Sequence, residues 1–278
     1  MNRVEKSIGV ALGGGGARGL AHVAILETLD AMGVRVSALA GTSIGAIIGS
    51  GYAAGRSAAD IRAVLDRILD VEPSSERWLT SKRLFRWLDL LDIEFGRSHI
   101  LEAQAFISEM SAYVGVETFE ELDIPLKVVA ADFWSRREVV FDSGPLMQSV
   151  AASFSLPGIF RPVIIDDQVL IDGGCVNPVP FDLLRDQCDI VIGVDVQGRR
   201  DPGDDQLPTY SEALFNTFQI ASSTIARMKM ALKPCDIYIE PAICDVRMLD
   251  FHKADQIYEQ TAPECERLEA ELTALLAE

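Results

Sequence analysis

Four consecutive glycines directly follow a short apolar stretch near the start of the chain, and they limit what it can fold into. The sequence reads IGVALGGGGARGLAHVAIL from Ile8, and apolar residues then recur at helical spacing up to Gly33. Because glycine loses more backbone freedom on folding than any other residue, such a run needs a reason. We expect a strand, a loop with free backbone amides and a helix. The amides would face either a phosphate or an oxyanion.

A second small-residue motif follows closely. The segment GTSIG at residues 41–45 matches GxSxG and lies between an apolar stretch, Val36–Ala40, and a small-residue helix expected over Ile44–Ala54. An elbow of this kind exposes the serine oxygen at the end of a strand, and the helix that follows favours negative charge at its amino end. The pattern therefore predicts that Ser43 is a nucleophile held in a tight turn.

The glycine loop also has a competing interpretation as a nucleotide site. Residues 14–19 read GGGARG and match GxGxxG, which is typical of dinucleotide-binding turns. Such a site also needs an acidic residue at the end of the second strand, where this chain has ALAGTS. The chain lacks the GxxxxGK[ST] pattern of a phosphate loop at this place as well. A catalytic site is therefore favoured, and a non-catalytic or nucleotide-binding regulator is the alternative.

A serine nucleophile needs a base, and the chain has only three histidines. His22 is expected to pack in the first helix or to make a hydrogen bond at its end, and His99 to cap a helix or lie at the surface. Only His252 preserves the chain order serine, aspartate, histidine. The other candidate base is Asp172, which follows an apolar strand and precedes two glycines that leave room beside its carboxylate.

Strands alternate with helices along the whole chain, which favours one α/β domain over residues 1–278 around a mainly parallel sheet. The uninterrupted apolar run Ile190–Val196 is typical of a strand inside a parallel sheet. A hairpin is expected where Val163–Ile165 and Val169–Ile171 flank DDQ. Helices are expected over Gly19–Met32, Ala58–Leu69, Leu101–Val114, Thr209–Ala231 and Lys253–Ala277, and further strands over Ser7–Leu12, Leu126–Ala131 and Glu138–Phe141.

Composition narrows the class of partner. The net charge of −17 argues against nucleic acid, which binds basic surfaces. No apolar run is long enough to cross a bilayer, and the first residues lack the pattern of a signal peptide, so a cytoplasmic protein is expected. The five cysteines show no CxxC spacing, so no metal site is expected.

Four segments, GGGGARGLAHVAIL, GTSIGA, SFSLPGIFRPV and IDGGCVNPVP, occur in this order between Ile8 and Val196. Together they resemble the patatin-like phospholipases, particularly the short bacterial members. The resemblance implies a three-layer α/β/α fold and a hydrolase of lipid acyl esters without metal or cofactor. It makes Ser43 the nucleophile and Asp172 its base, and it implies that Arg18 holds the glycine loop or a nearby carboxylate. It also implies an oxyanion hole of Gly14, Gly15 and Gly16, with site support from Arg18, Gly41, Gly45, Gly173 and Gly174.

One locally basic segment interrupts this acidic chain. Residues Glu76–Phe95 hold two of the three tryptophans, and apolar residues recur there at helical spacing. The pattern is typical of an interfacial helix or lid, and also of an ordinary helix packed over the core. We expect core packing for most of the apolar face. A helical cap at about 76–100, with peripheral membrane contact through Arg77–Phe95, is the sharper hypothesis.

Overall fold

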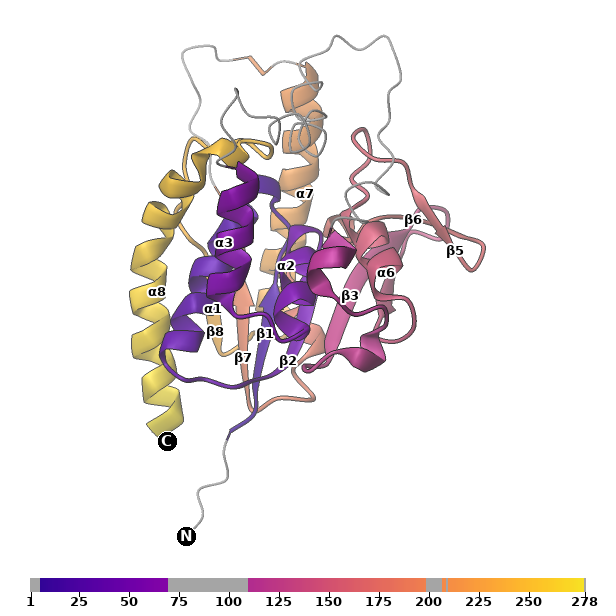
Figure 1. The fold of residues 1–278 in the computed structure, drawn as a ribbon. Coiled ribbons are helices and arrows are strands. Elements are labelled where there is room, and N and C mark those ends of the chain that lie inside the picture. Colours follow the sequence, from indigo (N-terminus) through magenta and orange to yellow (C-terminus); the bar gives the residue numbers. More distant parts are fainter. Residues whose placement is uncertain (1–5, 70–109, 199–206, 209, 278) are drawn as a thin grey trace.

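A twisted sheet runs through the middle of the protein, and its inner strands are the apolar stretches of the sequence (Figure 1). The structure, a computed structural model, describes residues 6–69, 110–198, 207–208 and 210–277. Strand order is β5-β6-β3-β2-β1-β7-β8, and β4 also pairs with β3. The strands are β1 (Ile8–Leu12), β2 (Val36–Thr42), β3 (Leu126–Asp132), β4 (Arg137–Phe141), β5 (Val163–Ile165), β6 (Gln168–Asp172), β7 (Ile190–Val194) and β8 (Ile237–Ile239).

The sheet has a parallel part and an antiparallel part. Strands β3, β2, β1, β7 and β8 pair in parallel, whereas β4 and β6 run antiparallel to β3, and β5 runs antiparallel to β6. This confirms the expected single α/β domain with a mainly parallel sheet.

Helices cover both faces of the sheet (Figure 1). The α-helices are α1 (Ala21–Ala31), α2 (Ile44–Ala53), α3 (Ala58–Leu69), α6 (Leu146–Phe154), α7 (Tyr210–Leu232) and α8 (Ala254–Ala277). Residues 110–114 are also helical. Short 3-10 turns are η1 (Gly16–Leu20), η3 (Phe119–Glu121), η4 (Gly173–Cys175), η5 (Phe181–Leu183) and η6 (Phe251–Lys253).

The alternation of side chains along β1 creates two hydrophobic cores. Ile8, Val10 and Leu12 point into the larger core, which also contains residues of α1, α2, α3, α6 and α8. Ala11 points to the opposite face and joins a smaller core that includes Phe181 and a residue of α7. Strands buried on both faces need no polar residues, which explains the uninterrupted apolar runs.

The structure departs from the expected elements in three places. The first helix is divided, because a 3-10 turn, η1, carries the chain from the glycine run into α1. Helix α6 and strand β8 were not expected at all. The expected cap at about 76–100, with Arg77–Phe95, lies outside the described residues, as does most of Leu101–Val114. Among the helices that are described, none combines the length and the hydrophobicity needed to cross a bilayer.

Candidate active site

Strands β2 and β6 follow one another along the same edge of β3, and this arrangement creates the site. Strand β2 pairs with Leu126–Val129 and β6 pairs with Ala130–Asp132. Strand β4 pairs with Val128–Asp132, which includes residues of β3 that also pair with β2 or with β6. One edge of a strand can hold only one partner at each position, so β4 occupies the opposite edge of β3. The carboxyl-terminal ends of β2 and β6 are therefore adjacent, because Thr42 pairs with Val129 and Asp172 pairs with Ala130. Ser43 follows the last residue of β2, and Asp172 is the last residue of β6.

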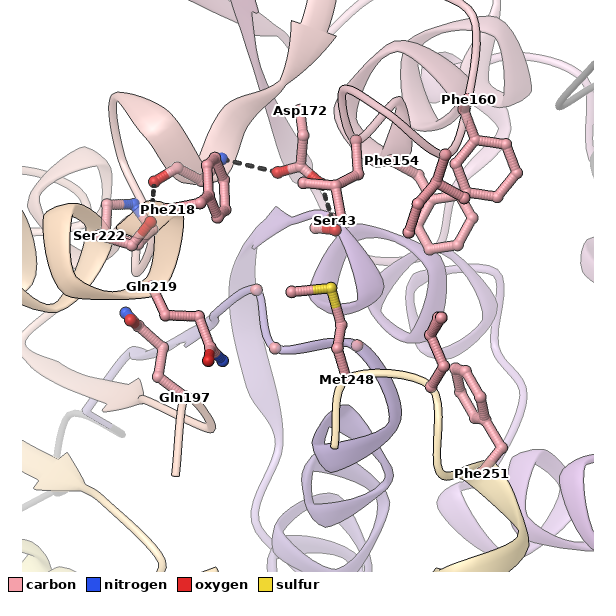
Figure 2. Close-up of a pocket in the computed structure, with 18 residues that line it drawn as sticks. Ser43, Phe154, Phe160, Asp172, Gln197, Phe218, Gln219, Ser222, Met248 and Phe251 are labelled. Atoms are coloured by element: carbon pink, nitrogen blue, oxygen red, sulfur yellow. Dashed lines mark hydrogen bonds between the residues drawn. The ribbon is translucent and has the colours of Figure 1, made fainter. Parts of the chain in front are cut away.

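Ser43 and Asp172 are in direct contact at this junction. The Ser43 hydroxyl donates a hydrogen bond of 2.6 Å to Oδ2 of Asp172 (Figure 2). The other carboxylate oxygen, Oδ1, accepts the backbone N–H of Gly174 at 2.8 Å. Both residues are buried, since only 8% of the surface of Ser43 and 3% of that of Asp172 is exposed to solvent. The two residues singled out in the sequence, 129 positions apart, thus form one hydrogen-bonded pair.

The environment of Asp172 makes its carboxylate a stronger base than usual. Burial raises the pKa of Asp172 to about 6, although the hydrogen bonds from Ser43 and Gly174 favour the charged form. The group is therefore ionised at neutral pH and can accept a proton. A raised pKa also makes proton acceptance from a serine hydroxyl less unfavourable.

The turn that carries Ser43 is strained and tightly packed. Ser43 has φ 55° and ψ −123°, in the left-handed region that disfavours residues other than glycine, and its N–H donates to Oγ of Ser153 at 2.8 Å. A Cβ at Gly45 would lie 2.1 Å from the carbonyl oxygen of Leu12, and one at Gly41 would lie 2.6 Å from the backbone of α2. Both glycines of the GxSxG motif are therefore required by close backbone contacts.

The glycine loop places two free amides beside Ser43. The N–H of Gly14 already donates to the carbonyl of Pro178 at 3.0 Å. In the described part of the chain, the amides of Gly15 and Gly16 have no acceptor. All three glycines line the same pocket as Ser43. Of the three glycines expected to form an oxyanion hole, Gly14 therefore has an amide that is already paired, and Gly15 and Gly16 have amides that are unpaired within the described residues.

The two glycines after Asp172 fix the carboxylate against the sheet. A Cβ at Gly173 would lie 2.3 Å from the carbonyl oxygen of Val129 in β3, so only glycine fits there. Gly174 provides the amide that holds Oδ1 of Asp172. Their expected role in site support is consistent with this geometry.

No described histidine contacts the Ser43 hydroxyl, whose hydrogen bond goes to Asp172. His22 is fully buried with Nε2 2.8 Å from the carbonyl oxygen of Gly13. Burial lowers the pKa of His22 to about 4, so the neutral ring donates its Nε2–H to that carbonyl and supports the glycine loop. His252 is exposed and does not line the pocket. His99 lies outside the described residues.

Arg18 is buried behind the pocket and does not line it. Its Nη1 donates to the carbonyl of Val246 at 3.4 Å. Burial lowers the pKa of Arg18 to about 10, although the negative charges of Asp195 and Asp250 act to raise it. Arg18 therefore connects η1 to the segment before η6, and this segment forms part of the pocket wall.

Much of the pocket wall comes from residues that the sequence did not indicate. Some lining residues lie in the segments that carry the resemblance: Phe154, Leu156, Ile159 and Phe160 belong to SFSLPGIFRPV, and Pro178 belongs to IDGGCVNPVP. Helix α7 was expected, but no local pattern connects it to Ser43 or Asp172. The described His, Cys, Asp and Glu side chains form no cluster that could hold a metal ion. The lining residues outside the segments singled out in the sequence are Gln197, Phe218, Gln219, Ser222, Met248, Leu249 and Phe251.

The fold and site define an α/β protein with a serine–carboxylate pair where a parallel and an antiparallel strand meet, beside a glycine loop. The model of the patatin-like phospholipase family matches residues 10–185, and the chain belongs to this family.

The chain is also similar to two relatives in sequence and to one solved structure in fold. An uncharacterized NTE family protein of Mycobacterium tuberculosis is 31% identical over 220 residues, which cover 78% of this chain and 57% of that protein. The neuropathy target esterase of Drosophila melanogaster is 31% identical over 212 residues, which cover 75% of this chain and 14% of that protein. The chain thus spans only part of these relatives. The fold is similar to that of VipD from Legionella pneumophila, with a TM-score of 0.52 at 15% identity over 95% of this chain and 67% of the other.

Proposed function

We propose that the protein hydrolyses carboxylic esters of lipids, with Ser43 as nucleophile and Asp172 as its base. The observation that carries the proposal is the 2.6 Å hydrogen bond from the Ser43 hydroxyl to the buried Asp172 carboxylate. Membership of the patatin-like phospholipase family supports it. So does the name of one relative, an esterase.

In the first half of the proposed reaction, the enzyme takes the acyl group. The Ser43 oxygen attacks the ester carbonyl carbon while its proton passes to Oδ2 of Asp172. The negative charge on the former carbonyl oxygen is stabilised by the Gly15 and Gly16 amides, each worth about 3–4 kcal/mol if well placed. As the tetrahedral intermediate collapses, Asp172 returns the proton to the departing alcohol.

In the second half, water releases the acid. Asp172 accepts a proton from a water molecule whose oxygen attacks the acyl-serine carbonyl, and the same two amides stabilise the new oxyanion. The intermediate collapses to free carboxylic acid, and the proton returns from Asp172 to the Ser43 oxygen. A single carboxylate thus serves both steps, and no histidine is needed.

The walls of the pocket support a lipid acyl chain as the group bound. Beside Ser43 lie side chains with no polar groups, contributed by α6 and the segment after it. Burying a CH₂ group of a substrate against such a wall contributes about 0.8 kcal/mol. These side chains are Phe154, Leu156, Ile159 and Phe160.

Ester turnover by matched serine variants tests the proposal. Wild-type protein should hydrolyse p-nitrophenyl hexanoate, and Ser43→Ala should lose about 10³-fold or more in kcat. The control is Ser143→Ala, which changes an exposed serine outside the pocket and should stay within about twofold of wild type. Full activity in folded Ser43→Ala would overturn the assignment. A folded wild-type protein that hydrolyses no ester but binds NAD or ATP would support the nucleotide-binding alternative.

A further inference from the structure

The pocket around Ser43 has an apolar end and a polar end. On one side of Ser43 lie the rings of Phe154 and Phe160 (Figure 2). On the opposite side lie the amide side chains of Gln197 and Gln219, together with the ring of Phe218 (Figure 2). An ester bound with its carbonyl at Ser43 would therefore extend one part along apolar side chains and the other toward two amides.

The polar end is attached firmly to the catalytic junction. Ser222 of α7 donates a hydrogen bond of 2.8 Å from Oγ to the carbonyl of Gly174, two residues after Asp172. Gln219 precedes Ser222 by three residues, so the two lie on the same face of α7. The turn of α7 that carries Gln219 is thus anchored next to the residues that hold the Asp172 carboxylate.

The two glutamines have hydrogen-bonding groups that the protein itself does not use. Gln197 is only 7% exposed, and its Oε1 accepts the hydroxyl of Ser223 at 2.7 Å, but its Nε2 has no partner. Among the described residues, nothing makes a hydrogen bond with the Gln219 side chain, which also lines the pocket. Buried polar groups are nearly always paired, so the unpaired Nε2 of Gln197 indicates that a ligand provides its partner. Gln219 is half-buried and lines the same pocket.

We propose that Gln219 and Gln197 bind the alcohol part of the ester through a free hydroxyl near the scissile bond, an inference that rests on the proposed function. A primary amide offers both donors and an acceptor, and a hydroxyl also does both, so the two groups match. The phenylalanine end receives the acyl chain. The ligand class is an acyl ester of glycerol or a similar polyol that keeps at least one hydroxyl free.

Three soluble hexanoate esters with different alcohols test this assignment: 1-hexanoylglycerol, ethyl hexanoate and p-nitrophenyl hexanoate. Gln219→Met removes the amide, retains the length of the side chain and breaks no hydrogen bond within the described protein. It should lower the ratio of kcat/KM for 1-hexanoylglycerol to kcat/KM for each of the other two esters about fivefold or more. Gln197→Met should show the same selectivity.

The control is Gln187→Met, an exposed glutamine outside the pocket, which should leave all three values unchanged. Thermal melting of each variant establishes that it is folded. Equal loss on all three esters, or no loss on 1-hexanoylglycerol in folded Gln219→Met, would overturn this inference while ester hydrolysis itself stands. If wild type hydrolyses none of the three, the proposed function fails instead.

Discussion

Asp172 shows how burial alone can change the chemistry of one side chain. A carboxylate in water is a weak base, but burial raises the pKa of Asp172 to about 6. The sequence indicated this residue and its partner Ser43 through two short motifs. It could not indicate the pKa, because the burial of Asp172 depends on residues from α6 and α7 that pack around it only in the folded chain.

The raised pKa of Asp172 gives the proposed reaction a defined pH dependence. Below about pH 6 the carboxyl group is protonated and cannot accept the Ser43 proton, so kcat/KM should fall about tenfold per pH unit. Between about pH 7 and 8 it should be constant. The measurement is a pH–rate profile with p-nitrophenyl hexanoate, with circular dichroism at each pH to verify folding. An inflection that disappears in His252→Ala would instead assign the titrating base to histidine.

At the scale of elements, short motifs predicted those turns whose geometry requires close contacts between backbone segments. The turn between β2 and α2 was predicted because its glycines are needed for local geometry. Helix α6 was missed because nearly all of its residues are buried, so it lacks the polar face that reveals an amphipathic helix. Strand β8 was missed because it has three residues, and its pairing with β7 is formed across a long stretch of sequence.

Two glycines of α2 should respond oppositely to the same substitution. Gly45→Ala places a Cβ 2.1 Å from the Leu12 carbonyl oxygen and should lower the free energy of unfolding by about 2–3 kcal/mol. Gly49→Ala meets only side-chain atoms at 3.5 Å or more and should raise it by about 0.5–1 kcal/mol through helix propensity. Urea unfolding followed by circular dichroism measures both. Equal stability of the two variants would contradict the described packing of the elbow.

At the scale of the whole molecule, the site combines segments from both halves of the chain. Ser43 and the glycine loop come from the first half, whereas Gln197, α7 and the segment before η6 come from the second. The motifs lie between Ile8 and Val196, and they indicated Ser43 and Asp172, which the folded chain brings into contact. The alternation of apolar strands and helices predicted the mainly parallel sheet. The sequence did not predict the far wall of the pocket, since long-range packing leaves no local pattern.

The charge of the whole chain should be visible in its stability. A net charge of −17 produces repulsion that unfolding relieves, and added salt screens it. Raising NaCl from 20 to 200 mM should therefore raise Tm by about 2–5 °C in scanning calorimetry. Potassium chloride should have the same effect, which controls for specific ion binding. A fall in Tm would show that surface ion pairs outweigh the repulsion.

The most direct test of the central claim is covalent labelling with a fluorophosphonate, with the modified peptide identified by mass spectrometry. Activation of Ser43 by Asp172 alone predicts one adduct, on Ser43. It also predicts labelling at least about 100-fold slower in Asp172→Asn and a wild-type rate in His252→Ala. An adduct on another residue, or loss of labelling in folded His252→Ala, would contradict it.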